Sequence, residues 1–177
     1  MGPDGNRLTD VSGFAETLDW IAIMNYDVWG PWSAAVGPNA PLNDACAPPA
    51  DKQGSAASAV AAWHAAGMPL AQIVLGVAAY GHSFSVTPAD AIASDGRMAA
   101  YPAFNASNEP VGDKWDDAAG IDECGNYEPQ GGLFDFWGLI DAGFLLPTGT
   151  VAPGIKYRFD ACSQTVSSAR VRRARRF

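Results

Sequence analysis

The chain has 177 residues, of which 48% are hydrophobic and 17% are charged, a composition that excludes a disordered protein and first suggests one domain. Its net charge of −8 argues against binding to nucleic acid, which requires a basic face. The sequence contains no run of about 18 apolar residues, so we expect no membrane span.

The basic residues are concentrated at the C-terminus. Five of the 11 Lys and Arg residues lie in the last eight positions, which leaves six against 19 acidic residues, a net charge of −13, in residues 1–169. We interpret residues 166–177 as a basic tail distinct from the rest of the chain. A nucleic acid or an anionic membrane is an alternative target for such a tail. The acidic body opposes both, so we expect neither as a partner.

The first predicted elements are a helix and a strand. Asp10 or Ser12 is a suitable cap for a short helix that runs through Phe14 and Leu18. Residues 18–24 are almost continuously apolar and are followed by Asn-Tyr-Asp. Such a run predicts a strand buried on both faces, as in a parallel sheet.

A strand–loop–helix–strand order follows. Residues 28–54 form a long loop rich in Pro, Gly, Asn and Asp, and loops of this length are often functional. Ser55 is a candidate N-cap for a helix that stops before Gly67 and Pro69. Residues 73–80 predict a second buried strand. Together these elements predict a βαβ unit with a right-handed crossover.

The remainder predicts an α+β segment without a metal site. Residues 85–165 lose the strand–helix alternation, and residues 131–137 fit either a helix start or an antiparallel strand. The two histidines, His64 and His82, are far apart in the sequence and join no Cys/His cluster, so we expect no metal and no cofactor. Three cysteines leave one unpaired within the chain.

Several short stretches resemble one known family. They are Met-Asn-Tyr-Asp at 24–27, Gly-Pro-Trp at 30–32, Gly-Pro-Asn-Ala-Pro-Leu at 37–42, Leu-Gly-Val-Ala-Ala-Tyr-Gly-His-Ser-Phe at 75–84, Phe-Trp-Gly at 136–138 and Asp-Ala-Cys-Ser-Gln at 160–164. Their order and spacing resemble the second half of glycoside hydrolase family 18, the chitinases, and look most like secreted fungal-type members. The resemblance covers roughly residues 8–165.

The resemblance implies a fold and a domain division. Family 18 enzymes are (β/α)8 TIM barrels, which need about 250 residues. By this resemblance residues 20–26 and 73–80 are barrel strands six and seven. Residues 1–83 are then a partial TIM-barrel segment, residues 84–165 the α+β chitinase insertion, and residues 166–177 a tail outside the family pattern. The fold class expected is α/β, a partial barrel that represents only the C-terminal part of the catalytic domain.

The resemblance also assigns roles to six residues. In the family's substrate-assisted retaining mechanism, a Glu protonates the glycosidic oxygen and the substrate's own N-acetyl oxygen attacks the anomeric carbon. Supporting catalytic roles fall to a Tyr that donates to the acetamido group and an Asp that holds sugar polar groups, which match Tyr26 and Asp27. Substrate-binding positions match Met24, Trp32, Tyr80 and, with packing as an equal alternative, Trp29.

The family's Asp-x-x-Asp-x-Asp-x-Glu motif, which carries the general acid, does not occur in this sequence. Asp113, Asp116 and Asp117 cluster, but their spacing to Glu123 does not reproduce the motif. We therefore expect a chitinase-like hydrolase fragment that is inactive alone, and whether the chain is an enzyme stays open. The alternative is a non-catalytic module that binds chitin or N-acetylglucosamine.

Other family positions carry further expectations. His82 stands where many members have Arg, and we interpret it as a packed or solvent-facing residue. A disulfide between Cys124 and Cys162 is plausible in a secreted protein, with Cys46 paired elsewhere or free. The first residues have no apolar stretch of a signal peptide, yet the resemblance implies an extracellular protein. Chitin or chito-oligosaccharide is the partner expected, with no obligate protein partner.

Overall fold

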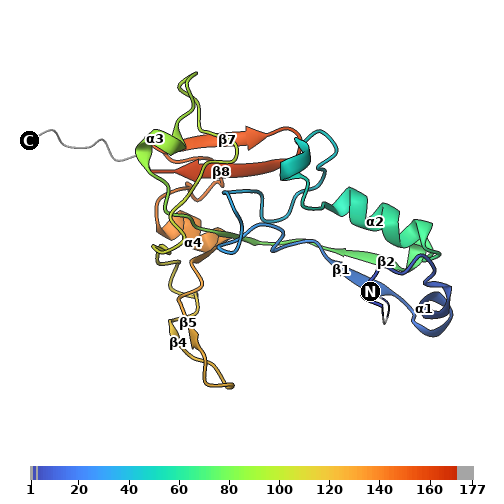
Figure 1. The fold of residues 1–177 in the computed structure, drawn as a ribbon. Coiled ribbons are helices and arrows are strands. Elements are labelled where there is room, and N and C mark those ends of the chain that lie inside the picture. Colours follow the sequence, from blue (N-terminus) through green and yellow to red (C-terminus); the bar gives the residue numbers. More distant parts are fainter. Residues whose placement is uncertain (1, 3, 171–177) are drawn as a thin grey trace, which may run out of the picture.

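A computed structural model describes residue 2 and residues 4–170. Its first part is a βαβ unit in which β1 (Ile21–Met24) pairs in parallel with β2 (Ile73–Gly76), with Ile21 opposite Ile73. Helix α2 (Ala56–Ala65) connects the two strands and contacts both (Figure 1). A short helix, α1 (Ser12–Thr17), precedes β1. The predicted strand–helix–strand order is confirmed.

Local sequence signals explain the helix boundaries. The Ser55 hydroxyl accepts a hydrogen bond from the backbone N–H of Ser58, and the Ser58 hydroxyl accepts one from the backbone N–H of Ser55. This reciprocal capping box satisfies donors that the first turn of a helix leaves free. The prediction of Ser55 as N-cap is confirmed. Helix α1 has Val11 as N-cap, although the Asp10 carboxylate accepts from the N–H of Ser12 at 2.9 Å.

The long loop between β1 and α2 contains only a 3-10 turn at Pro49–Asp51. A second 3-10 turn, Leu70–Gln72, leads into β2. The side chain of Gln72 donates to the carbonyl of Leu18 at 2.9 Å, which fastens this turn to the end of α1. The loop prediction for residues 28–54 therefore holds, apart from one short turn.

The strands of the βαβ unit are less buried than their sequence predicts. Ile23 is buried, but Met24 is 72% exposed and Val77 is 78% exposed. Helix α2 contacts both strands, yet these side chains of the predicted strand regions remain open to solvent. The expectation of strands buried on both faces is wrong for this chain.

The predicted strand at residues 73–80 is two strands. After β2 ends, β3 (Tyr80–His82) pairs antiparallel with β6 (Leu133–Asp135), so that Gly81 lies opposite Phe134. The apolar run continues through the break, so hydrophobicity alone shows one element. A distant segment that offers a new hydrogen-bonding partner causes the division.

From β3 to residue 170 the structure is α+β. Its elements are α3 (Pro88–Ala91), the hairpin of β4 (Gly120–Ile121) and β5 (Tyr127–Glu128), α4 (Phe136–Asp141), and the hairpin of β7 (Lys156–Asp160) and β8 (Thr165–Ala169). Residues 131–137 contain both expected alternatives, because β6 runs directly into α4. The β4–β5 hairpin projects away from the other elements (Figure 1).

The strand pairing crosses both expected segment boundaries. β3 lies before residue 84, yet it pairs with β6 inside the α+β segment. Val166–Ala169 belong to the expected basic tail, yet they pair with β7 as part of β8. The Arg170 side chain lies over the Phe144 ring at 5.3 Å and donates to the carbonyl of Ala142. The other four arginines of the tail lie outside the described residues.

The disulfide prediction is wrong. Cys162 pairs with Cys46, and Cys124 is free and exposed. Cys124 lies in the turn between β4 and β5, whereas the turn between β7 and β8 carries Cys162 next to the long loop. A backbone hydrogen bond from Leu42 to the carbonyl of Ser163 joins these two segments. Spatial contact between the loop and the hairpin therefore selects the pair.

No helix in the described part of the chain is long and apolar enough to cross a membrane.

Candidate functional site

Asp27, which follows the C-terminal end of β1, has an uncommon backbone conformation. Asp27 has φ of 55°, in the left-handed region that non-glycine residues seldom adopt. Its N–H donates to Oδ1 of Asn39 at 2.8 Å, and Nδ2 of Asn39 donates to the carbonyl of Tyr80 at 3.0 Å. Asn39 therefore ties the end of β1 to the start of β3. Strained residues of this kind persist where surrounding contacts over-determine them, often at functional sites.

Two side chains of β3 hold the Asp27 carboxylate. The Tyr80 hydroxyl donates to Oδ1 of Asp27 at 2.6 Å, and Nε2 of His82 lies 2.9 Å from the same oxygen. Alternate residues of a strand point to one face, so Tyr80 and His82 approach Asp27 together. Within the described residues Oδ2 of Asp27 makes no hydrogen bond, and the side chain is 45% exposed. We call Asp27, Tyr80 and His82 the carboxylate cluster.

The phenol of Tyr80 is held in its protonated form. Burial first, and then the hydrogen bond to and the negative charge of Asp27, raise the pKa of Tyr80 well above its usual value. The hydroxyl therefore remains a donor to the carboxylate throughout the neutral range. Because the Tyr80 hydroxyl is always the donor, Oδ1 of Asp27 is the acceptor in this hydrogen bond.

Aromatic rings surround the carboxylate cluster. The Trp32 ring lies edge-on to His82, with centroids 5.5 Å apart, and the Tyr26 ring is 6.3 Å from that of Tyr80. Trp32 is 64% exposed, and its indole occupies the space where a Cβ at Gly30 would stand. Gly30 is thus required for this position of Trp32. The result is a flat apolar surface that lies against His82, one of the two residues that hold the Asp27 carboxylate.

The predicted site residues differ in their exposure. The structure brings four of them together, namely Tyr26, Asp27, Trp32 and Tyr80. Met24 is exposed at the end of β1. Trp29 is only 4% exposed, packs against Tyr101 at 5.5 Å and fills the space over Gly37. Of the two roles expected for Trp29, substrate binding and packing, the burial of its indole favours packing.

His82 is packed, as the sequence interpretation allows, with only 7% of its side chain exposed, and it also belongs to the carboxylate cluster, which sequence reasoning missed. The interpretation as a packed or solvent-facing residue overlooked its hydrogen bond to Asp27. One signal was available, because His82 lies two positions after Tyr80 and therefore on the same face of a strand. The sequence does not show that β3 lies beside Asp27, so this signal could not identify the residue that His82 contacts.

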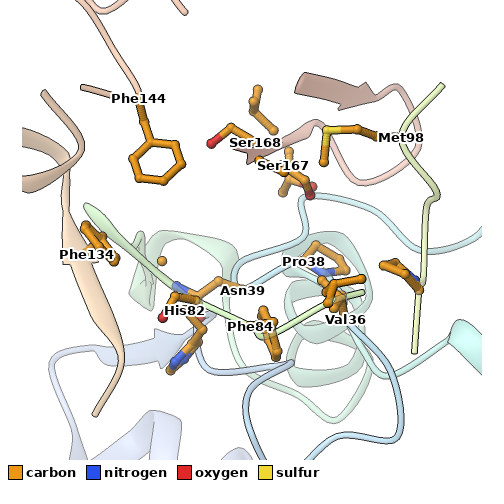
Figure 2. Close-up of a pocket in the computed structure, with 18 of the residues that line it drawn as sticks. Val36, Pro38, Asn39, His82, Phe84, Met98, Phe134, Phe144, Ser167 and Ser168 are labelled. Carbon is orange, nitrogen blue, oxygen red and sulfur yellow. The ribbon is translucent and has the colours of Figure 1, made fainter. Parts of the chain in front are cut away.

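A cavity of ≈ 860 Å³ lies behind β3. Figure 2 shows Ser167 and Ser168 of β8 on one side, Phe84 and Pro38 on the other, and Phe134 and Phe144 at one end. Asn39, Tyr80 and His82 belong to its lining, whereas Asp27 and Trp32 do not. The cavity and the exposed carboxylate are therefore separate spaces that share the strand β3.

The described residues contain no group of three or more His, Cys, Asp or Glu side chains able to hold a metal ion. The arrangement that is present offers an acceptor oxygen, phenol hydroxyls and an exposed indole. Such a set suits a ligand with hydroxyl donors and a flat C–H face.

Comparisons with known proteins agree on one family. The family model for Glycosyl hydrolases family 18 matches residues 2–139. A "chitinase-like effector" of Moniliophthora roreri is 60% identical over 163 residues, which cover 91% of this chain and 40% of that protein. The chain thus spans about two fifths of the length of this relative.

Solved structures give the same result. A chitinase from Rhizomucor miehei superposes with a TM-score of 0.76 at 28% identity, over 93% of this chain and 43% of that one. YKL-39, solved in the presence of chitooligosaccharides, superposes with a TM-score of 0.58 at 23% identity, over 90% of this chain and 36% of that one. The second likeness concerns the fold alone.

Proposed function

Because the chain belongs to glycosyl hydrolase family 18, we propose that it corresponds to the C-terminal part of a chitinase-like catalytic domain and binds β-1,4-linked N-acetylglucosamine polymers without hydrolysing them. In this assignment β1 and β2 are barrel strands six and seven. The observation that carries the proposal is the Asp27 carboxylate, held through Oδ1 by Tyr80 and His82 and without a partner at Oδ2 among the described residues. The exposed indole of Trp32 packs against the same His82.

The proposed contacts follow from the chemistry of a chito-oligosaccharide. Sugar hydroxyls donate hydrogen bonds, and Oδ2 of Asp27 accepts one. The C–H face of a pyranose ring stacks on a flat apolar surface such as the indole of Trp32. The Tyr26 hydroxyl donates to the acetamido group, as the family resemblance implies, and Met24 lines the floor of the subsite.

Trp32→Ala is expected to weaken binding to a chito-oligosaccharide by about tenfold, because it removes the stacking surface. Isothermal titration calorimetry with a soluble oligosaccharide measures this dissociation constant. Trp115→Ala is the matched control, since Trp115 is exposed to a similar degree, 67% against 64%, and lies in the α+β segment. Equal affinities of the two variants would contradict the proposal.

The isolated chain is expected to release no product from a chito-oligosaccharide. Substrate-assisted hydrolysis still requires an acid to protonate the leaving oxygen. The motif that carries this acid in the family does not occur in the sequence. Chromatography of the oligosaccharide after prolonged incubation tests the expectation, with Trp32→Ala prepared identically as a control for contaminating enzyme. Product formed by the unaltered chain and lost in that variant would overturn it.

We further propose an extracellular location, with chitin or its oligosaccharides as the partner. The disulfide between Cys46 and Cys162 supports this location, because disulfides persist chiefly in oxidising compartments. Neither a cofactor nor an obligate protein partner is part of the proposal.

A further inference from the structure

His82 differs from the other members of the carboxylate cluster in its surroundings. Its side chain is only 7% exposed, while that of Asp27 is 45% exposed. The imidazole ring lies edge-on to Trp32 at 5.5 Å and to Tyr80 at 6.0 Å. Its Nδ1 is buried without a hydrogen-bonding partner among the described residues. The ring is therefore fixed on several sides and has one polar contact, through Nε2.

The contact between His82 and Asp27 has a defined direction. An ionised carboxylate has no proton to give, so Nε2 of His82 must carry the hydrogen and donate it to Oδ1. Oδ1 then accepts from both His82 and Tyr80, while Oδ2 accepts from neither. Two donors on one oxygen suppress rotation of the carboxylate, which otherwise has a broad torsional preference.

The backbone of Asp27 makes this restraint necessary. A residue other than glycine at φ of 55° is in a sparsely populated conformation that persists only where its contacts over-determine it. Asn39 holds the N–H of Asp27, and Tyr80 and His82 hold the carboxylate. His82 also touches Trp32, so one buried ring orients both the carboxylate and the indole.

We propose that His82 is a positioning residue for carbohydrate binding, which acts by donating from Nε2 to Oδ1 of Asp27 and so presents Oδ2 to the ligand beside Trp32. The proposal rests on the proposed function and deepens it, because it assigns ligand orientation to a residue that does not touch the ligand.

Two amides separate the hydrogen bond from the shape of the ring. In His82→Gln the amide nitrogen lies as far along the side chain as Nε2, so it can donate to Asp27. In His82→Asn the amide nitrogen lies at the level of Nδ1 and falls short of Asp27. We expect His82→Asn to weaken binding of a chito-oligosaccharide by about tenfold, the equivalent of one charge-assisted hydrogen bond. His82→Gln is expected to stay within about threefold of the unaltered chain.

The control is His64→Ala, which removes the other histidine and one hydrogen bond, to the carbonyl of Met68 next to α2. It is expected to leave the dissociation constant unchanged. Equal losses for the Gln and Asn variants would show that only the imidazole shape matters and would overturn the proposal.

A second readout needs no ligand. The ¹⁵N resonances of the His82 ring are expected to show the proton on Nε2, and Asp27→Asn is expected to shift the Nε2 proton resonance. Absence of carbohydrate binding by the unaltered chain would refute the proposed function. The NMR measurement would still test the hydrogen bond between His82 and Asp27. A proton on Nδ1 alone, or no response to Asp27→Asn, would refute the role of His82 even if carbohydrate binds.

Discussion

Replacing Cys46 by Ser is expected to lower the free energy of unfolding by roughly 4–5 kcal/mol. The Cys46–Cys162 disulfide closes a loop between residues that are 116 positions apart in the sequence. In the chain-entropy account the stabilisation grows with the logarithm of loop length and reaches this size for a loop of about 100 residues. This is a large share of the 5–15 kcal/mol that typically stabilises a domain.

The disulfide also restrains the loop that contributes Asn39 to the candidate site. It joins the segment after Leu42 to the turn that contains Ser163, and a backbone hydrogen bond of 2.9 Å links these two residues. The same loop carries Asn39, which binds both Asp27 and Tyr80. Loss of the disulfide should therefore weaken carbohydrate binding as well as stability.

Urea unfolding followed by tryptophan fluorescence measures the change in stability. Cys124→Ser is the matched control, because Cys124 is free and exposed and its replacement should leave the midpoint unchanged. Peptide mapping under non-reducing conditions identifies the pair directly. A Cys124–Cys162 peptide, or equal midpoints for the two variants, would contradict the assignment.

Asp116→Ala is expected to lower the free energy of unfolding by about 3 kcal/mol. The carboxylate of Asp116 accepts from three backbone N–H groups, those of Gly132 at 2.8 Å, Leu133 at 3.1 Å and Gly112 at 3.2 Å. Each partly buried donor left without a partner costs on the order of 1 kcal/mol or more. Alanine removes all three acceptor contacts at once.

The effect should reach the candidate site through β6. Leu133 of that strand pairs with His82, so Asp116 helps to hold the strand that positions the carboxylate cluster. Asp117→Ala is the matched control, since no hydrogen bond of the Asp117 side chain occurs within residues 4–170. Chemical denaturation of both variants provides the measurement, and a stability of Asp116→Ala equal to that of Asp117→Ala would contradict this role.

The role of the acidic residues at 113–117 could not be predicted from their spacing in the sequence. Asp113, Asp116 and Asp117 do not reproduce the family's catalytic spacing, and the sequence offers no further reason for their grouping. In the structure Asp113 accepts from the N–H of Asp135, and Asp116 accepts from β6 and the segment before it. Both carboxylates satisfy backbone donors that lie 16 to 22 residues further along the chain, and a local sequence pattern does not reveal such donors.

The amino-acid sequence was sufficient to predict the βαβ unit, the Ser55 cap and the long loop, and to indicate the family through motifs around Asp27 and Tyr80. These features depend on hydrogen bonds and apolar patterns within a few residues, or on short stretches in a fixed order. Four features could be seen only in the folded chain: the partner of Cys162, the division of the second strand, the burial of Trp29 and the hydrogen bond between His82 and Asp27. Each of these is a contact between segments distant in the chain, so its outcome depends on which surfaces the fold brings together.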